Sequence, residues 1–562
     1  MSKTSSPLTR ILNLVKLERK EITAVYIYAI LNGLIQLSLP LGVQAIIGFV
    51  LGAAMRASLI VLIILIVLGV LAVGIMQVNQ MKVIEKIQQK LFVRYSFAFA
   101  EHIPTLDLKK TDNIYLPELV NRFFDIPVLQ KSLSKILLDI PTASIQILFG
   151  LILLSFYHPA FILFGTILII LLWLILRYTG SNGLQTSIEE STYKYKVAGW
   201  LAETARVIKS MKLAKSNDLH LRKTDESVIG YLNARNNHFK ILLFQYNLLV
   251  VFKTIITAAM LIVGTLLLVN QQLNIGQFIA AEIVILLVLN SVEKLIMNLE
   301  SVYDTLTSVE KIGSLTDKPV EKNGSLQLSK SGEGLKLEMK EVTFSYDDET
   351  DVLHNISLQI NSGEKVCIKG NDSSGKSTLL RLMAGTYTDF KGAMLIDNVP
   401  LGNYDLTSIR SQTGVLLNQQ DIFNGTLWEN ISLGNQDISM ENVIGYSDKV
   451  GLNYFITTLK YGYDTILDPT GKRLPSNIIH KILLVRALAG KPRILLLEEP
   501  WINTEEVYQR QIIQLLTEIK NTTVIVVSND EEFGIQCDQI ITLVDGSIDT
   551  SGISQKNNNE QR

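Results

Sequence analysis

One loop in the sequence has the residue types and spacing needed to bind phosphate groups. The apolar run 365–369 leads into this loop, and a helical stretch follows it. The loop fits the pattern G-x-x-x-x-G-K-[ST] and consists of Gly370, Asn371, Asp372, Ser373, Ser374, Gly375, Lys376, Ser377 and Thr378. Its glycines let backbone N–H groups wrap round phosphates, and the N-terminus of the helix favours negative charge. We expect Lys376 to reach the β- and γ-phosphates and the Ser377 hydroxyl to ligate Mg²⁺.

The residues that surround this loop resemble the ABC (ATP-binding cassette) ATPases over essentially all of 335–548. The apolar run 494–497, followed by Glu498 and Glu499, is similar to the Walker B strand of that family. Tyr346 stands where the family has an aromatic ring that stacks on adenine. The segments 425–431, 462–465, 486–488 and 540–548 match further landmarks of the family at the expected spacing. A membrane-tethered P-loop kinase is a weaker alternative, because no acceptor-binding region remains once these landmarks are assigned.

The resemblance implies that ATP and Mg²⁺ bind here, but the positions expected to handle the metal and the attacking water are altered. Glu499 is retained as the general base. Glu498 replaces an aspartate, and its extra methylene should place its Mg²⁺ contact less well. Asn418 replaces the glutamine that senses Mg²⁺, although Gln419 and Gln420 follow it. We expect Ser377, Glu498 and Asn418 to form the metal side of the site.

The elements that would face a partner's nucleotide are altered as well. Leu474, Pro475, Ser476, Asn477 and Ile478 replace the signature Leu-Ser-Gly-Gly-Gln. Without its two glycines this backbone is not expected to approach a partner's γ-phosphate closely. Asn529 replaces the switch histidine beside the nucleotide, and Glu505 replaces the D-loop aspartate. The resemblance therefore implies an ATP-binding domain whose hydrolysis is weak when the chain is alone.

Six apolar runs of about the 20 residues needed to cross a bilayer precede this domain. They lie at 22–49, 57–78, 137–157, 160–178, 243–269 and 275–292, and short and long connections alternate between them. The long connections, 79–136 and 180–242, are rich in Lys and Arg, which predicts that they and both termini lie in the cytosol. Their helical periodicity predicts extensions of the membrane helices. The resemblance to the ABC family implies short helices near 110–116 and 212–220 that dock on the nucleotide-binding domain.

The composition agrees with a chain that is part membrane and part soluble. Of its 562 residues 48% are hydrophobic and 19% are charged, and its formal net charge of -1 argues against a nucleic-acid binder. Its two cysteines predict no disulfide framework. Two charges fall within predicted spans. We expect Lys253 to reach the headgroups of the inner leaflet and Glu282 to line a cavity or bond a neighbouring helix.

Six helices in three pairs resemble the type I exporters of the ABC family, and 32–52 resembles the first span of exporters in type I secretion systems. The expected fold is an α-helical transmembrane domain plus a cytosolic α/β P-loop ATPase domain. Its expected divisions are an N-terminal cytosolic segment (1–21), a six-span domain (22–315), a linker (316–334), the nucleotide-binding domain (335–550) and a disordered tail (551–562).

These observations predict a half-transporter of the bacterial inner membrane that exports a substrate, and a peptide or protein fits the secretion-like first span. The expected partners are membrane lipid and a second half-transporter, with a heterodimer favoured over a homodimer. A periplasmic adaptor protein is left open as a further partner, and nucleic acid is not expected. The alternative is a regulatory or structural membrane subunit that binds ATP and gates an assembly without turnover. ATP turnover separates these two hypotheses.

Overall fold

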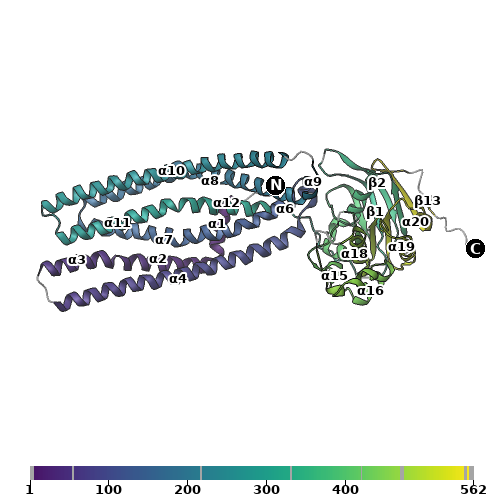
Figure 1. Cartoon of the computed structure of the whole chain (residues 1–562), viewed down its shortest axis with the longest axis horizontal. Helices are drawn as coiled ribbons and strands as arrows, with labels where there is room; N and C mark the ends of the chain where they lie inside the picture. Colours follow the sequence, from purple (N-terminus) through teal and green to yellow (C-terminus); the bar gives the residue numbers. More distant parts are fainter. Residues whose placement is uncertain are drawn as a thin grey trace, which may run out of the picture. The chain divides into compact units, whose positions relative to one another are not determined.

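The computed structural model describes residues 6–52, 56–214, 218–329, 332–347, 349–418, 420–468, 474–549 and 554–555. The chain forms two compact units (Figure 1). Unit 1 comprises Met1–Pro104 and Ile114–Lys318, and unit 2 comprises Thr105–Asn113 and Pro319–Arg562. The short segment Thr105–Asn113, although it lies between two helices of unit 1 in the sequence, is therefore part of unit 2.

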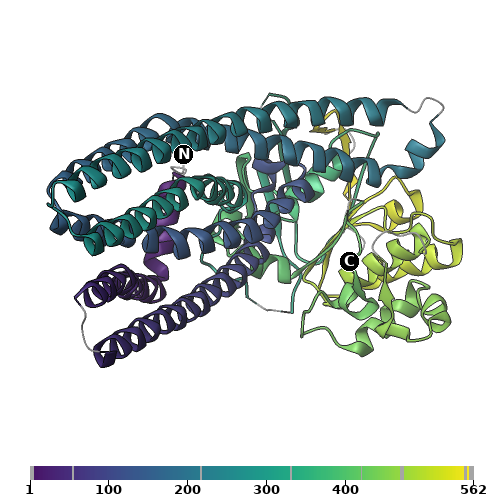
Figure 2. The same ribbon diagram turned by 60° about the vertical axis from the view of Figure 1, so that its left-hand side comes forward.

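Unit 1 is built from helices, most of them long. Their bounds are α1 Pro7–Leu17, α2 Arg19–Gln36, α3 Ser38–Leu51, α4 Arg56–His102, α6 Leu116–Val120, α7 Asp125–Tyr157, α8 Ala160–Arg206, α9 Ile208–Leu213, α10 Asp218–Val269, α11 Ile275–Met297 and α12 Leu299–Thr316. The helices α8 and α10 run side by side over much of their length, as Figure 2 also shows. The long cytosolic connections thus continue the membrane helices.

Five helical stretches among the described residues are long and apolar enough to cross a membrane. They are Arg19–Leu51, Ala57–Thr105, Leu116–Tyr157, Asp218–Val269 and Ile275–Thr316, and the shorter apolar stretch Ala160–Ile175 opens α8. Together these account for the six predicted spans. The first span is divided into α2 and α3 at Leu37, three residues before Pro40, whose ring disfavours an uninterrupted helix.

A proline inside α7 explains a polar contact between two of these helices. Pro141 has no N–H, so the carbonyl of Leu137, four residues earlier, lacks its helical partner. The fully buried Gln80 of α4 donates its side-chain amide to Leu137 O at 3.4 Å. A freed backbone carbonyl is costly inside a membrane domain, so this contact satisfies α7 and joins it to α4.

One charged residue within the predicted spans has a partner that the sequence did not suggest. The ammonium group of Lys253 in α10 lies 2.6 Å from the carboxylate of Glu293 in α11. The contact of Lys253 with the headgroups of the inner leaflet stays a prediction. A carboxylate from a neighbouring helix neutralises the lysine within the helical unit, which avoids an unpaired charge in a low-dielectric region.

Unit 2 contains the nucleotide-binding fold predicted from the sequence. Its strands are β1 Leu337–Ser345, β2 Asp351–Ile360, β3 Lys365–Gly370, β4 Lys391–Ile396, β5 Val399–Pro400, β6 Thr413–Leu416, β7 Gly425–Thr426, β8 Ile466–Leu467, β9 Ile494–Glu498, β10 Thr523–Val527, β11 Gln539–Val544, β12 Ser547–Ile548 and β13 Ser554–Gln555. Its helices are α5 Leu108–Thr111, α13 Lys376–Met383, α14 Leu406–Ser411, α15 Leu427–Ser432, α16 Met440–Lys449, α17 Asn453–Thr458, α18 Ser476–Ala489, α19 Glu506–Glu518 and α20 Glu531–Gln536.

A mostly parallel sheet positions the site. Its strand order is β12-β11-β3-β10-β9-β6, and the strands from β11 to β6 are parallel. Every residue of β9 and β10 is buried, as expected for continuous apolar strands covered on both faces. Because β3, β10 and β9 are parallel neighbours, the residues that follow them emerge at one edge of the sheet.

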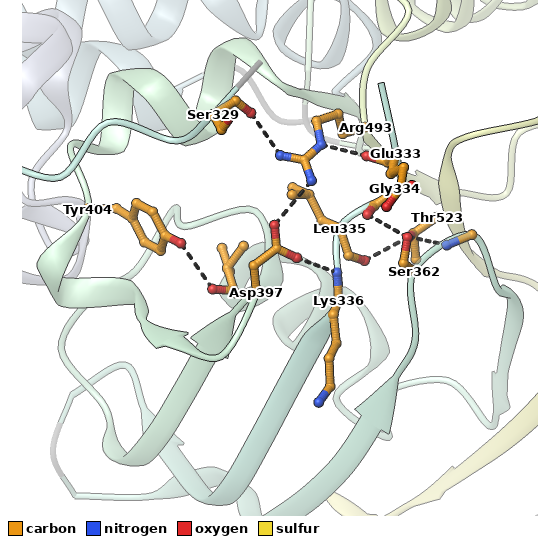
Figure 3. A network of polar contacts seen from close by, with 12 residues as sticks. Ser329, Glu333, Gly334, Leu335, Lys336, Ser362, Asp397, Tyr404, Arg493 and Thr523 are labelled. Atoms are coloured by element: carbon orange, nitrogen blue, oxygen red, sulfur yellow. Dashed lines mark hydrogen bonds and ion pairs between the residues drawn. The ribbon is translucent and has the colours of Figure 1, made fainter. Parts of the chain in front are cut away.

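Arg493 fixes the segment that enters unit 2 to the body of that unit (Figure 3). Its guanidinium donates to the carbonyls of Ser329 (2.9 Å) and Glu333 (2.5 Å) and to the carboxylate of Asp397 (3.1 Å). Arg493 is 6% exposed, so these contacts satisfy a buried cation. The stretch 316–334, expected from its composition to be a linker, is thus tied to the nucleotide-binding fold over much of its length.

Three other expected segments can be followed at least in part. The first predicted docking helix corresponds to α5, and Leu106, two residues before it, forms an antiparallel bridge with Val320 within unit 2. The second corresponds to α9, although 215–217 lie outside the described residues. Of the tail 551–562 only β13 is described, and it pairs with β11. The expected disorder of the other tail residues falls outside the described part of the chain.

Candidate nucleotide site

The loop predicted to bind phosphate connects β3 to α13. Two of its glycines have positive φ angles, 152° at Gly370 and 95° at Gly375. A Cβ atom on Gly370 would lie 2.4 Å from Leu543 O, and one on Gly375 would lie 2.7 Å from the Leu353 side chain. Gly370 therefore requires glycine for space as well as conformation, and Gly375 requires it for conformation. Ser373 also has a positive φ, 64°, so a residue with a side chain occupies a strained conformation within the loop.

This loop lines a cavity of about 480 Å³ together with residues that are distant in the sequence. The lining includes 372–378 from the loop and α13, Asn418 after β6, and Glu498 and Glu499 at the end of β9. The structure thus brings together the predicted phosphate loop, the predicted metal residues and the predicted general base. Gly370, Asn371, Tyr346 and Asn529 are not in this lining.

The metal side of the site is held together by hydrogen bonds to Glu498. The Ser377 hydroxyl donates to one carboxylate oxygen of Glu498, and the backbone N–H of Asn418 donates to the other at 3.0 Å. The longer side chain of glutamate therefore spans directly from β9 to the phosphate loop. Mg²⁺ is usually held by one or two protein oxygens together with substrate phosphates, and the Ser377–Glu498 pair offers such a donor set.

The side chain of Lys376 is held at the phosphate loop by two backbone carbonyls. Its ammonium group donates to Gly370 O at 2.8 Å and to Asn371 O at 2.6 Å. These two carbonyls keep the positive charge at the loop, where it would bind phosphate oxygens by charge-assisted hydrogen bonds. The glycine cradle, the lysine and the hydroxyl–carboxylate pair together fit a nucleoside triphosphate with its magnesium ion.

Glu499, the predicted general base, has a strained backbone and a raised pKa. Its φ is 44°, and one carboxylate oxygen accepts a hydrogen bond from the Ser528 hydroxyl at 3.0 Å. Burial raises the pKa of Glu499 above its usual range, and the hydrogen bond from Ser528 opposes this shift only in part. Sequence reasoning missed Ser528, although it directly precedes Asn529 at the end of β10, next to β9.

Asn529 binds the phosphate loop from the side of β10. Its side-chain oxygen accepts from the N–H of Gly370 at 3.2 Å, and its side-chain nitrogen donates to Gly370 O at 3.3 Å. Both polar atoms of the side chain are therefore engaged with the first residue of the loop. The amide at this position supports the loop's backbone, a role that a histidine ring cannot reproduce because its two nitrogens point in different directions.

Tyr346 lies beside the first turn of α13. Its hydroxyl is 2.9 Å from the Thr378 hydroxyl, and its ring makes edge contacts with Phe344 and Tyr387 at centroid distances of 5.0 and 5.5 Å. Phe344 is 1% exposed, so the half-buried Tyr346 is held by a rigid aromatic cluster next to the phosphate loop. This position is compatible with the base-stacking role that the resemblance implies.

The segment that replaces the signature begins α18. Pro475 is the residue before the helix and provides no side-chain cap, and Asn477 bonds the backbone of Ile478 next to it. Further along α18, the buried Lys481 donates to the carboxylate of Glu505 at 3.0 Å. This ion pair joins α18 to the start of α19 and involves the residue that replaces the D-loop aspartate. No local sequence pattern marks Lys481 as the partner of Glu505.

Comparisons with known proteins identify the domains that hold these residues. The model of the ABC transporter transmembrane region matches residues 22–292, and the ABC transporter model matches residues 353–502.

The chain belongs to the ABC transporters.

Its relatives include several proteins of toxin secretion. It is 29% identical over 359 residues to the alpha-hemolysin translocation ATP-binding protein HlyB of Escherichia coli O157:H7. This alignment covers 63% of this chain and 50% of HlyB. It is 26% identical over 496 residues to the uncharacterized ABC transporter ATP-binding protein YknV of Bacillus subtilis, covering 84% of this chain and 80% of YknV. The chain spans about half the length of the toxin-secretion relatives it matches.

A solved structure shows the same fold. A bacterial Atm1-family ABC exporter with ATP bound superposes with a TM-score of 0.83 at 18% identity, covering 94% of each chain. The predicted fold class, a helical transmembrane domain of an ABC exporter followed by an ABC ATPase domain, is confirmed. This ABC transporter is a multi-pass protein of the inner (plasma) membrane with its nucleotide-binding domain in the cytosol. Exporters of this family work as dimers, and the ABC domain implies ATP binding.

Proposed function

We propose that this chain is a half-transporter that exports a polypeptide across the inner membrane and hydrolyses ATP slowly by itself. The observation that carries the proposal is the cavity beside the phosphate loop, where Lys376, Ser377, Glu498 and Glu499 come together in a chain that also has an exporter membrane domain. The polypeptide substrate is supported by relatives named for translocation of alpha-hemolysin and secretion of cyclolysin.

Within this proposal the chain's residues bind Mg²⁺ and ATP as follows. Lys376 and the N–H groups of the loop hold the phosphates, Ser377 and Glu498 hold the metal ion, and Tyr346 orients the base. Glu499 accepts a proton from the attacking water, and its raised pKa suits it to hold that proton. Asn418 lies at the metal side through its backbone contact with Glu498.

Slow hydrolysis follows from the groups that are replaced. Loss of one preorganised catalytic donor typically costs about 10²–10³ in rate. Here Asn529 is engaged with Gly370, and the residues 474–478 offer no glycine to a partner's γ-phosphate. When the chain pairs with a second copy of itself, both losses fall in each composite site, so hydrolysis there is slow.

A second half-transporter completes the proposed assembly. The helix α9 exposes Ile208 (47%) and Leu213 (84%), apolar side chains that a cytosolic domain of another subunit would cover. A heterodimer is favoured over a homodimer, since a partner with intact motifs would supply faster turnover. A periplasmic adaptor is a further proposed partner.

The test is ATP-driven uptake of a labelled, unfolded polypeptide into inside-out vesicles that contain the chain with its genomic neighbour. We expect Lys376→Ala to abolish both nucleotide binding and uptake, whereas Lys336→Ala, remote from the loop, keeps both. Unchanged nucleotide affinity in Lys376→Ala would contradict the phosphate-binding role. Nucleotide binding without any transport of polypeptide or lipid would favour the regulatory subunit instead.

Glu282 is proposed to line the export path. It is half-buried on α11, one helical turn before the exposed Leu286. Glu282→Gln should alter transport while assembly and membrane insertion remain normal. Failure of this variant to fold, with no selective change in transport, would assign Glu282 to a structural contact between helices.

A further inference from the structure

A cavity of about 630 Å³ in unit 1 combines side-chain amides with apolar residues. It lies against α2, α7 and α11. Its lining includes the amides Gln36, Gln146 and Asn290, the hydroxyl of Ser291 and the apolar side chains of Leu286 and Met297. Pockets that bind organic ligands typically have this composition, a largely apolar wall with a few convergent polar groups.

A directed chain of hydrogen bonds crosses the three helices and ends at this cavity. The Ser291 hydroxyl donates to the side-chain oxygen of Gln146 at 2.7 Å, and the side-chain nitrogen of Gln146 donates to the side-chain oxygen of Gln36. Ser291 is 1% and Gln146 6% exposed, whereas Gln36 is half-buried. Within the described part of the chain the amide nitrogen of Gln36 has no further partner. Successive hydrogen bonds polarise one another, so Gln36 presents a strengthened donor to the cavity.

The face of α11 that borders the cavity is not suited to lipid. Leu286, Asn290, Lys294 and Met297 recur at helical spacing, and all four are exposed. An exposed amide and an exposed ammonium group on a transmembrane helix are costly in hydrocarbon, where backbone and side-chain polar groups find no partner. This face therefore borders a hydrated space, and Asn290 adds an amide, able both to donate and to accept, to the lining that also contains Gln36.

The residues that line the cavity carry little net charge. Glu293, which also lines it, is paired with Lys253 at 2.6 Å, so Lys294 is the one other charged residue of the lining. A ligand that matches this wall is mainly neutral, alternates hydrogen-bond donors and acceptors, and carries apolar groups. An extended polypeptide has this pattern, because each residue other than proline offers one N–H and one C=O.

We propose that Gln36 and Asn290 form a subsite that binds the backbone of the exported polypeptide in an extended conformation. Gln36 donates to a carbonyl, Asn290 accepts from an N–H, and Leu286 and Met297 contact the side chains between them. The stripe from Leu286 to Met297 rises about 16 Å along the helix axis and would accommodate about five extended residues. This inference rests on the polypeptide export proposed above and assigns residues to it.

The experiment uses the full chain in lipid nanodiscs and the fluorescence anisotropy of a labelled, unstructured twelve-residue peptide. A second peptide of the same sequence carries N-methyl groups on its backbone nitrogens, which removes the N–H donors. We expect Gln36→Leu and Asn290→Leu each to weaken binding roughly 3- to 10-fold. The matched control Asn270→Leu, in the turn after α10, should bind as the wild type does. N-methylation should weaken binding to the wild type and have little further effect in Asn290→Leu.

The outcomes separate this inference from the export function. Equal binding of both peptides to the wild type, or wild-type affinity in both leucine variants, would overturn the backbone subsite while leaving polypeptide export intact if vesicle uptake persists. Absence of both peptide binding and peptide uptake, together with movement of a fluorescent phospholipid, would overturn the export of polypeptide itself.

Discussion

Replacing Asn529 by alanine isolates the contribution of its amide to nucleotide binding. The variant loses two hydrogen bonds to Gly370, one to its N–H at 3.2 Å and one from Asn529 to its carbonyl at 3.3 Å. A neutral hydrogen bond contributes a net 0.5–1.5 kcal/mol, and about 0.5 kcal/mol applies here because the contact is open to solvent. The loop must then be ordered by the nucleotide itself, at a cost of about 1 kcal/mol, or roughly fivefold in affinity.

The assay is equilibrium binding of a fluorescent ATP analogue with Mg²⁺ to the purified full chain. Asn361→Ala is the matched control, because it removes the side-chain hydrogen bonds of Asn361 with Gln359 and Glu364 in a turn before β3 and leaves the loop untouched. Asn529→His should also weaken binding, since one imidazole cannot bond both the N–H and the carbonyl of Gly370. Wild-type affinity in Asn529→Ala would refute the reasoning, and so would tighter binding in Asn529→His.

Three further predictions concern stability. Ser373→Val should weaken nucleotide binding and lower thermal stability by about 1–2 kcal/mol, because a β-branched residue tolerates the φ of 64° poorly. Ser373→Gly should match or exceed the wild type in both. Equal behaviour of the wild type and both variants would contradict the claim that Ser373 is strained. Arg493→Ala should destabilise the nucleotide-binding unit by about 3 kcal/mol in thermal unfolding, because it removes a buried network. The control is Arg510→Ala, at an exposed position. If Arg493→Ala lost no more stability than this control, the buried network would be shown to be unimportant. Burial raises the pKa of Glu499, so the ionised carboxylate lowers the stability of the fold as pH rises. Glu499→Gln should therefore stabilise the fold at neutral pH and lose this advantage below the pKa of a glutamate in the unfolded chain. Unfolding midpoints measured across pH would contradict this if the wild type and the variant differed by a constant amount.

The phosphate loop, the carboxylates at the end of β9 and the pairs of apolar runs could be predicted because each depends on residues close together in the sequence. Spacing alone fixes Gly370 and Gly375 at the ends of a tight loop, and four apolar residues before Glu498 identify a buried strand. The contacts that decide how these parts behave join distant elements. Ser528 with Glu499 and Lys253 with Glu293 depend on which strands and helices become neighbours, and no local pattern marks them.

The break between α2 and α3 and the attachment of 319–334 to unit 2 were missed for related reasons. Pro40 was a local sign that the first span would not be one straight helix. By contrast, the composition of a polar stretch such as 319–334 predicts a linker when the residue that binds it is distant in the sequence. Arg493, more than 150 residues away, is that partner.

The most direct test of the account is the ATPase rate of the purified chain, alone and with its genomic neighbour, with Glu499→Gln as the matched variant of each. We predict slow hydrolysis by the chain alone and faster hydrolysis by the pair, most of which persists when Glu499 is replaced because the partner's own catalytic residues carry it. Brisk hydrolysis by the chain alone that Glu499→Gln abolishes would contradict the central claim that the replaced residues at 474–478 and Asn529 limit turnover.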